Sequence, residues 1–387
     1  MTDTLRIGQA VGAGLRRAME DDPKVLLMGE DVGKLGGVFR VTDGLQKDFG
    51  EDRVIDTPLA ESGILGTAIG LAIRGWRPVC EIQFNGFVYP AFDQIVCQLA
   101  KMHYRSQGTV PLPIVVRIPC GGGIGAVEHH SESPEAYFAH TAGLKVVSCS
   151  DSNDAYWMIQ QAIASQDPVI FFEPLRRYQE KGEVDTSGSL DTAHPLLASK
   201  VEREGTDATV VAWGSMTKVA HDAATAAAED GRSLEVINLR TLSPLDMGPV
   251  YESVKKTGRM VVVHEAPSNV GIGAEIAARV TQDCFYSSSR RYFVSPATTL
   301  LTRPPGWRRT TFPTSTECST RSTGRSVTRG ADAETGTVQP SRPGRGPRRR
   351  RNHQVVGPAG RHRHAEPADR RGRDRQGAHR DPLAVRR

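Results

Sequence analysis

The chain has 387 residues, enough for two domains, and its 49 basic and 44 acidic residues give a net charge of +5. An apolar fraction of 38% and a charged fraction of 24% are those of a globular protein. No apolar run reaches the roughly 18 residues of a membrane span, and no basic-then-apolar signal peptide begins the chain. Six scattered cysteines without a CxxC pair favour free thiols, so we expect a cytoplasmic protein.

The first 180 residues alternate short apolar runs with helical segments. The helix candidates are residues 7–20, 63–74, 90–104 and 153–165, and the strand candidates are residues 25–28, 53–56, 79–82, 114–118, 144–147 and 169–172. This alternation predicts an α/β fold in which helices cover both faces of a parallel sheet.

The rest of the chain divides into three parts. Residues 181–204 are polar and irregular and are interpreted as a linker. Residues 205–286 form a second α/β unit, with strands expected at 208–213, 234–238 and 260–264 and helices at 216–230 and 273–281. From residue 287 onward Arg, Thr, Ser, Pro and Gly dominate, which predicts a disordered basic tail over 287–387. Much of the positive charge lies in this tail.

One acid stands out at a predicted strand-to-helix turn. Thr57 and Pro58 end the strand, and Glu61 then begins a helix rich in small residues. A carboxylate in the first turn suits the positive end of a helix dipole. A capping role is therefore the simpler alternative to a chemical role for Glu61.

Several short motifs follow one another in the first 286 residues. They are Met-Gly-Glu-Asp-Val-Gly at 28–33, Gly-Gly-Val-Phe at 36–39, Asp-Thr-Pro-Leu-Ala-Glu-Ser-Gly at 56–63, Glu-Ile-Gln-Phe at 81–84, Pro-Ala-Phe-Asp-Gln-Ile at 90–95, His-His-Ser-Glu-Ser-Pro-Glu-Ala at 129–136 and Val-His-Glu-Ala-Pro at 263–267. In this order they resemble the β subunit of the thiamine diphosphate-dependent 2-oxoacid dehydrogenases. The resemblance implies two transketolase-like domains with mostly parallel sheets: a pyrimidine-binding domain at 1–180 and a truncated C-terminal-like domain at 205–286.

The resemblance assigns roles to four residues near the cofactor. Glu61 matches the carboxylate that hydrogen-bonds N1′ of the aminopyrimidine and promotes its imino form as the internal base. Phe87 matches an aromatic residue that packs on the aminopyrimidine ring, for which a core aromatic is the alternative. Gln83 and Glu30 fall where relatives place polar groups near the cofactor, and an ordinary structural role is equally open for both.

A second catalytic residue is expected in the Gly-rich loop that follows the strand near residue 118. His130 matches a histidine that donates protons during reductive acylation of a lipoyl group. Relatives usually carry Gln where this chain has Glu132, and a carboxylate close to His130 would raise the pKa of the imidazole. His129, His140 and His264 are interpreted as structural.

The resemblance also implies a monovalent cation, for which K⁺ is the candidate, bound partly through backbone carbonyls. Ser165 replaces a common acid at one of its positions. The matching residues are Leu112, Ile114, Val115, Ala162, Ser165 and Asp167.

What the chain lacks points to a partner. A complete thiamine enzyme holds Mg²⁺ and the diphosphate with a Gly-Asp-Gly motif and a later Asn, and this chain contains no Gly-Asp-Gly. The resemblance therefore implies an α subunit that holds Mg²⁺ and shares thiamine diphosphate in an α2β2 assembly. A 2-oxoacid substrate and a lipoyl acyltransferase core complete the implied partners. Membrane contact is not expected.

Three further interpretations remain to be weighed. Residues 36–39 and 133–140 favour a branched-chain 2-oxoacid over pyruvate, with a pyruvate dehydrogenase β subunit as the alternative. A self-sufficient transketolase is disfavoured by the missing diphosphate motif. A basic-tailed nucleic-acid-binding protein rests on the tail alone.

The tail itself has another explanation. With GC-rich codons, residues 297–307 and 310–323 read in one alternative frame resemble the C-terminus of the same family. We therefore favour a change of reading frame close to Tyr286, which sequencing the gene across codons 280–300 would test.

Overall fold

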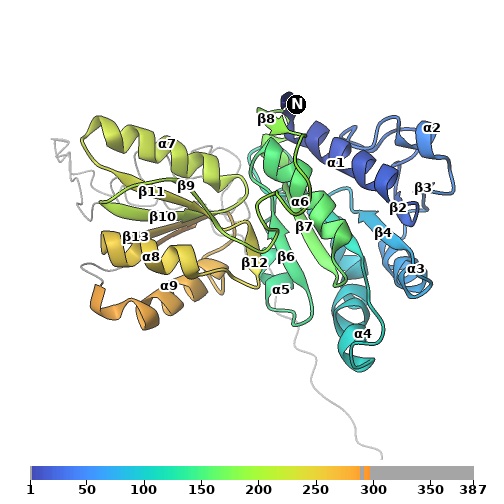
Figure 1. Cartoon of the computed structure of the whole chain (residues 1–387). Helices are drawn as coiled ribbons and strands as arrows, with labels where there is room; N and C mark the ends of the chain where they lie inside the picture. Colours follow the sequence, from blue (N-terminus) through green and yellow to red (C-terminus); the bar gives the residue numbers. More distant parts are fainter. Residues whose placement is uncertain (1, 288–291, 297–387) are drawn as a thin grey trace, which may run out of the picture. The chain divides into compact units, whose positions relative to one another are not determined.

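The computed structural model describes residues 2–287 and 292–296 (Figure 1). Apolar and β-branched runs build a seven-stranded sheet in the order β12-β6-β7-β5-β4-β2-β3. All neighbours in it are parallel except β12, which is antiparallel to β6. The strands are β2 (Val25–Gly29), β3 (Val54–Asp56), β4 (Arg77–Glu81), β5 (Val115–Cys120), β6 (Lys145–Ser148), β7 (Val169–Pro174) and β12 (Thr241–Ser243).

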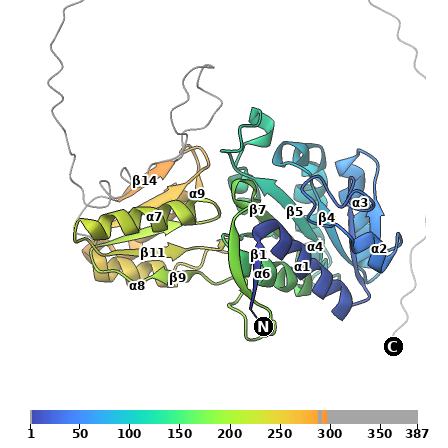
Figure 2. The same cartoon turned by 90° about the horizontal axis from the view of Figure 1, so that it is seen from above.

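Helices cover both faces of this sheet, as the sequence predicts (Figures 1 and 2). On one face α1 (Ile7–Asp21) and α6 (Ser152–Ala164) pack together over Val25 and Leu27 of β2. On the other face α3 (Glu61–Ile73) packs over Leu26 and Met28. Because alternate residues of a strand point to opposite faces, one strand supplies both cores.

The segment predicted as a helix over residues 90–104 is helical, but it is irregular rather than one α-helix. The structure has a 3₁₀ helix η1 (Asn85–Ala91), a π-helical turn η2 (Gln94–Leu99) and a short α4 (Ala100–Arg105). Pro90 lies inside η1 and has no N–H to donate, so a regular α-helix does not form through it. Further short helices are α2 (Leu45–Phe49), η3 (Glu128–His130), α5 (Glu135–Ala139), η4 (Leu175–Arg177) and η5 (Phe285–Ser287).

The predicted linker is also partly wrong, because both its ends are strands. β8 (Lys181–Asp185) pairs antiparallel with β1 (Thr2–Arg6), and β9 (Lys200–Arg203) pairs antiparallel with β11. These short strands expose most of their side chains, so their sequences are polar. Apolar runs predict buried strands, so they do not predict these polar ones.

The second domain contains a five-stranded sheet in the order β14-β13-β10-β11-β9. Ala-rich α7 (Met216–Glu229) packs on one face. On the other face α8 (Gly248–Thr257) and α9 (Ile272–Asp283) join a core that continues into the first domain. The remaining strands are β10 (Ala208–Ala212), β11 (Leu234–Asn238), β13 (Met260–His264) and β14 (Phe293–Pro296).

Strand β14 corrects the predicted start of the tail. It lies parallel to β13 within the stretch expected to be disordered, and Tyr292 and Val294 pack against the core. Aromatic and β-branched residues suit such a sheet edge. The remaining predicted disorder and the proposed change of frame fall on residues 288–291 and 297–387, outside the described residues.

Cys80, Cys97, Cys120, Cys149 and Cys284 are free. No helix among the described residues is long and apolar enough to cross a bilayer.

A fully buried arginine ties three central strands together. Arg117 of β5 donates through Nη1 to Glu81 of β4 at 2.5 Å, and through Nε and Nη2 to Glu173 of β7 at 2.6 and 2.9 Å. Tyr178 also donates to Glu173. Burial acts to lower the pKa of Arg117, but the two carboxylates outweigh it and raise that pKa. The guanidinium is therefore charged in the core.

We predict that Arg117→Met lowers the free energy of unfolding by about 3–5 kcal/mol, because it leaves two buried carboxylates without their cation. Arg279→Met is the matched control: it breaks a surface pair with Glu275 at 2.7 Å and should change stability by less than about 1 kcal/mol. Denaturant unfolding of the full chain measures both. Equal effects of the two substitutions would show that the buried network does not stabilise the fold.

Candidate active site

The predicted site residues follow four neighbouring strands. Glu30 comes after β2, Glu61 after β3, Gln83 and Phe87 after β4, and His130 after β5. These strands lie in the order β5-β4-β2-β3 and are parallel, so their carboxyl ends share one edge of the sheet. The carboxyl edge is where open α/β sheets place their ligands. The fold thus brings four separated segments of the chain to one region.

Glu61 is the first residue of α3, with Ala60 as the preceding cap residue. No side-chain hydrogen bond caps the helix, and the structure records no hydrogen bond or ion pair for the Glu61 carboxylate among the described residues. The capping alternative therefore loses its hydrogen bond, although the helix dipole still favours the charge. Glu61 presents an acceptor that nothing in the described chain uses.

Glu30 lies beside Glu61 and is more deeply buried, at 5% exposure. Burial raises the pKa of Glu30, and the charges of Glu61 and Asp31 raise it further. Its Oε1 atom is buried without a hydrogen-bond partner. Gln83 donates to the Asp31 carboxylate at 3.1 Å and to the Glu30 carbonyl at 3.4 Å, which joins the ends of β2 and β4. Glu30 and Glu61 are thus neighbouring acids with carboxylate oxygens that accept no hydrogen bond from the described residues.

His130 belongs to an aromatic cluster. Its ring stacks on Phe84, with centroids 3.9 Å apart and planes at 16°, and meets Phe87 edge-on at 5.2 Å. Phe39 packs on the far side against Phe84 at 5.2 Å. The sequence predicts a role for Phe87 and none for Phe84, although Phe84 ends the motif at residues 81–84. The Nδ1 atom of His130 is buried without a hydrogen-bond partner.

The Glu132 carboxylate is directed to Tyr89 rather than held for His130. The Tyr89 hydroxyl donates to Oε2 of Glu132 at 3.0 Å. Burial raises the pKa of Tyr89, and the hydrogen bond to Glu132 raises it further. The departure from the usual Gln is therefore matched by a hydroxyl donor in this chain.

Comparison with known proteins identifies the family. Residues 3–181 match the transketolase pyrimidine-binding domain and residues 198–293 the transketolase C-terminal domain. The chain is 64% identical over 284 residues to "Pyruvate dehydrogenase E1 component subunit beta" of Leifsonia xyli subsp. xyli, covering 73% of this chain and 83% of that protein. The chain belongs to the family of 2-oxoacid dehydrogenase β subunits. Members of this family are subunits of the decarboxylating component of a 2-oxoacid dehydrogenase complex.

A second sequence relative and a solved structure extend the comparison. This β subunit is 53% identical over 287 residues to "3-methyl-2-oxobutanoate dehydrogenase subunit beta" of Mycobacterium tuberculosis, covering 74% of the chain and 82% of that protein. Among solved structures, "Split gene transketolase, inactive beta4 tetramer" matches with a TM-score of 0.66 and 20% identity, covering 83% of this chain and 98% of the other. The last comparison confirms the transketolase-like α/β fold that the motifs implied.

The residues assigned to a monovalent cation lie at the opposite edge of the sheet. Leu112, Ile114 and Val115 lead into or begin β5. Ala162 lies in the last turn of α6, and Ser165 and Asp167 lie between α6 and β7. The carbonyl of Ile114 accepts from the Val169 amide at 2.9 Å, and that of Ser165 from Arg77 at 3.3 Å. The Asp167 carboxylate pairs with Lys145 at 2.9 Å. The K⁺ site therefore stays a prediction.

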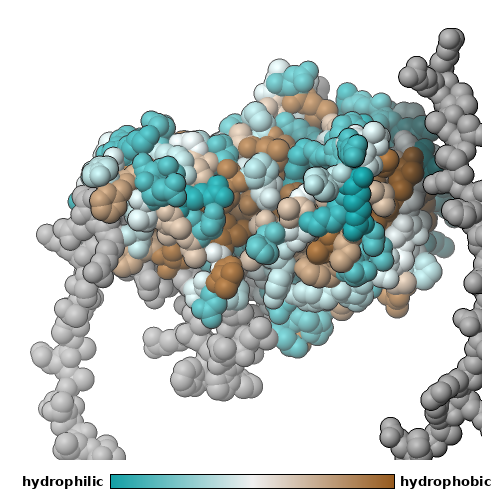
Figure 3. Space-filling view, turned by 90° about the horizontal axis from the view of Figure 1, so that it is seen from below, coloured by the Kyte–Doolittle hydropathy of each residue, from teal (hydrophilic) through white to brown (hydrophobic). Residues whose placement is uncertain are grey.

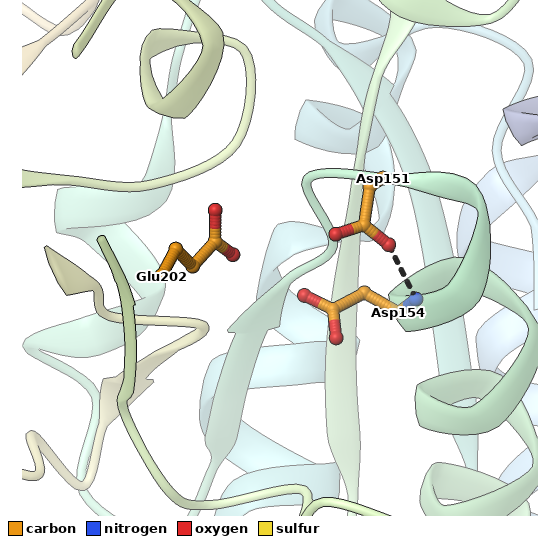
Figure 4. A group of neighbouring side chains, drawn as sticks. All are labelled: Asp151, Asp154 and Glu202. Carbon is orange, nitrogen blue, oxygen red and sulfur yellow. Dashed lines mark hydrogen bonds between the residues drawn. The ribbon is translucent and has the colours of Figure 1, made fainter. Parts of the chain in front are cut away.

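Three acids at the start of α6 and on β9 carry no metal assignment. Asp151 caps α6 by accepting from the Asp154 amide at 2.8 Å, and Glu202 approaches them from β9 (Figure 4). Arg240 donates to Asp154 at 3.0 Å, and Asn238 donates to Glu202 at 2.8 Å. This group is thus compensated by the chain's own donors and links the two domains.

We predict that Glu30→Gln makes the unfolding free energy less sensitive to pH. The pKa of Glu30 is raised in the folded state, so its stabilising contribution is complete below the unfolded pKa and is lost as pH rises through the folded pKa. The variant should therefore gain stability relative to the parent as the pH rises from the unfolded pKa of a glutamate, about 4.3, through the raised folded pKa. Denaturant unfolding across this range measures it, with exposed Glu51→Gln as control. A parent–variant difference that does not change with pH would contradict the assignment.

Proposed function

We propose that this β subunit supplies half of a thiamine diphosphate-dependent active site that decarboxylates a 2-oxoacid and acylates a lipoyl group. The observation that carries the proposal is the unpartnered Glu61 carboxylate. It stands beside buried Glu30 on the sheet edge that also bears His130. Glu61 is partly buried, and the buried acids among the described residues are mostly paired. An acid without a partner at this edge suits a ligand that donates a hydrogen bond.

The residues present fit the aminopyrimidine half of the cofactor. Glu61 would accept a hydrogen bond from N1′ and exchange a proton there. Glu30 and Gln83 would lie next to the polar groups of the aminopyrimidine. The edge of Phe87 would bound the apolar side. When bound, thiamine diphosphate supplies the electron sink that decarboxylation of a 2-oxoacid requires. The task of Glu61 is to set the protonation state at N1′.

His130 would act in the second half of the reaction. An imidazole is the side chain best suited to give up a proton near neutral pH. Its stack on Phe84 fixes the plane of the ring, and its buried Nδ1 has no partner in the chain. These features support a proton donor to the lipoyl sulfur during acyl transfer.

The site loops expose apolar side chains that a partner would cover. Single exposed apolar residues are normal on any protein surface. The face drawn in Figure 3 accordingly shows both hydrophilic and hydrophobic residues. On the segments after β2, β3, β4 and β5, however, six large apolar side chains are exposed near the same edge of the sheet, which supports an interaction surface there. They are Leu35 at 42%, Val38 at 41%, Leu59 at 84%, Tyr89 at 42%, Ile124 at 39% and Val127 at 53%.

We assign that partner to an α subunit in an α2β2 assembly. The chain has no Gly-Asp-Gly motif, so the α subunit would hold Mg²⁺ and the diphosphate. A lipoyl acyltransferase core would receive the acyl group, and K⁺ would bind at the amino edge of the sheet. The free cysteines support a cytoplasmic location. If the reading frame changes near Tyr286, the tail has no role of its own. The nucleic-acid-binding alternative, which rests only on the tail, then has no support.

For the substrate we propose a branched-chain 2-oxoacid, with pyruvate as the second candidate. Residues 36–39 and 133–140 favour the branched-chain type. The 64% identity to a protein named as a pyruvate dehydrogenase subunit, against 53% for the 3-methyl-2-oxobutanoate type, favours pyruvate. Measuring kcat/KM for 3-methyl-2-oxobutanoate and for pyruvate with the assembled enzyme decides between them. A higher value for pyruvate would reverse our choice.

We predict that Glu61→Gln, in the chain assembled with its α subunit, lowers 2-oxoacid decarboxylation by ~10²–10⁴-fold, because an amide cannot take up and return the N1′ proton. Cofactor binding, followed by calorimetry, should persist because the diphosphate is held by the α subunit. The exposed Glu51→Gln serves as control.

Two results would count against this assignment. Near-normal turnover of the Glu61→Gln enzyme would return Glu61 to a helix-dipole role. Turnover of any 2-oxoacid by the purified chain alone, with thiamine diphosphate and Mg²⁺, would remove the need for the α subunit.

A further inference from the structure

The loop that carries His130 runs over residues 121–134, from the end of β5 to the start of α5. Gly121, Gly123 and Gly125 have positive φ values of 93°, 88° and 76°, so the first part of the loop depends on glycine. Within the first domain, the Gly121 amide donates to the Glu132 carbonyl at 2.8 Å, and this closes the base of the loop.

The second domain contacts the beginning of this loop through Glu265. This residue directly follows β13, and its carboxylate accepts from the Ser215 hydroxyl. The nearby Gly122 backbone amide acts to lower the pKa of Glu265. A Cβ atom on Gly121 would lie 2.5 Å from Oε2 of Glu265, so the carboxylate sits directly against the loop backbone. Its other oxygen, Oε1, is buried without a partner.

The second domain also contacts the residue just beyond the loop. Glu135, the first residue of α5, is buried at 4% exposure. It accepts from Nε1 of Trp213 at 3.2 Å. The Trp213 ring stacks on buried His264, with centroids 5.3 Å apart and planes at 7°. Trp213 follows β10 and His264 ends β13, so two neighbouring strands support this contact.

Both contacts line one small cavity, where Glu135 and Trp213 are buried and Glu265 is partly exposed. The cavity has a volume of about 20 Å³, which is room for about one water. Burial raises the pKa of Glu265 to about 7 and that of Glu135 to about 8. The hydrogen bond to the buried Glu135 carboxylate is therefore costly to break.

We propose that Glu265 and Trp213 are positioning residues, through which the second domain holds the two ends of the 121–134 loop and so places His130. The inference rests on the proposed role of His130 in acyl transfer. Neither residue touches the reacting groups in this assignment. Their effect runs through the loop backbone, and it is separate from the chemistry assigned to Glu61 on the far side of β4 and β2.

Hydrogen exchange of the full chain tests the hold on the loop without any cofactor or partner. Glu265→Ala removes the carboxylate that lies against the loop backbone at Gly121, and we expect exchange within residues 121–134 to rise by about tenfold or more, while β4 and β5 keep their protection. Glu265→Gln keeps an oxygen and the same side-chain size at this position and should remain close to the parent. Glu275→Gln, an exposed change on α9, is the control. Unchanged exchange in Glu265→Ala overturns the proposal.

Kinetics of the assembled enzyme test the consequence. Acylation of a lipoyl domain should fall about 10–100-fold in Glu265→Ala and in Trp213→Phe, because a misplaced proton donor is costly. Decarboxylation measured with an artificial electron acceptor should stay within about threefold, since Glu61 is not held by this loop. Equal losses in both assays, or none, would overturn the positioning role. If the parent enzyme decarboxylates no 2-oxoacid, the proposed function fails, while the exchange result still decides whether the loop is held.

Discussion

Arg117 joins the central strands β4, β5 and β7 near the edge on which the site residues lie. It is buried between Glu81 at the end of β4 and Glu173 near the end of β7. Two residues after Glu81 the chain reaches Gln83 and then Phe84. Isolated charges in such a place would cost several kcal/mol each, so the pairing must hold the three strands in close register. The position of the site residues after β4 and β5 is therefore tied to the geometry of one guanidinium group.

The same network extends into the aromatic cluster. Tyr178 donates to Glu173, and its ring meets Phe39 edge-on at 5.4 Å. Phe39 meets Phe84, which stacks on His130. A continuous series of packed groups thus runs from the buried charge to the predicted proton donor. From the other side, Glu265 and Trp213 hold the loop that completes this arrangement.

Much of the fold was readable from the sequence because its strands are fully buried. Runs such as residues 25–28 and 169–172 are apolar throughout, and the helices between them have clear boundaries. The polar strands β1, β8 and β9 were not found, since edge strands with exposed faces lack that pattern. The irregular helical stretch from η1 to α4 was not predicted as such, although Pro90 lies within its 3₁₀ part and has no N–H to donate.

The candidate site was predictable where a motif carries an isolated polar residue, as with Glu61 and His130. Phe84 was not singled out, because an aromatic residue beside a strand usually packs in the core, and only coordinates show which ring it faces. Contacts between distant segments, such as Glu265 with Gly122, leave no trace in local sequence. Glu132 shows the reverse case: its unusual carboxylate was noticed, but its partner Tyr89 became evident only in three dimensions.

The exposed apolar residues near Glu61 have a consequence for the stability of the unassembled subunit against degradation in a cell. Leu59, at 84% exposure, and its neighbours on the adjoining loops form a surface like the one that chaperones and proteases recognise in unfinished proteins. An unassembled subunit therefore exposes an apolar surface typical of an incompletely folded protein, although its core is folded. Assembly would cover this surface, so the amount of this subunit would follow the supply of its partner without any dedicated regulator.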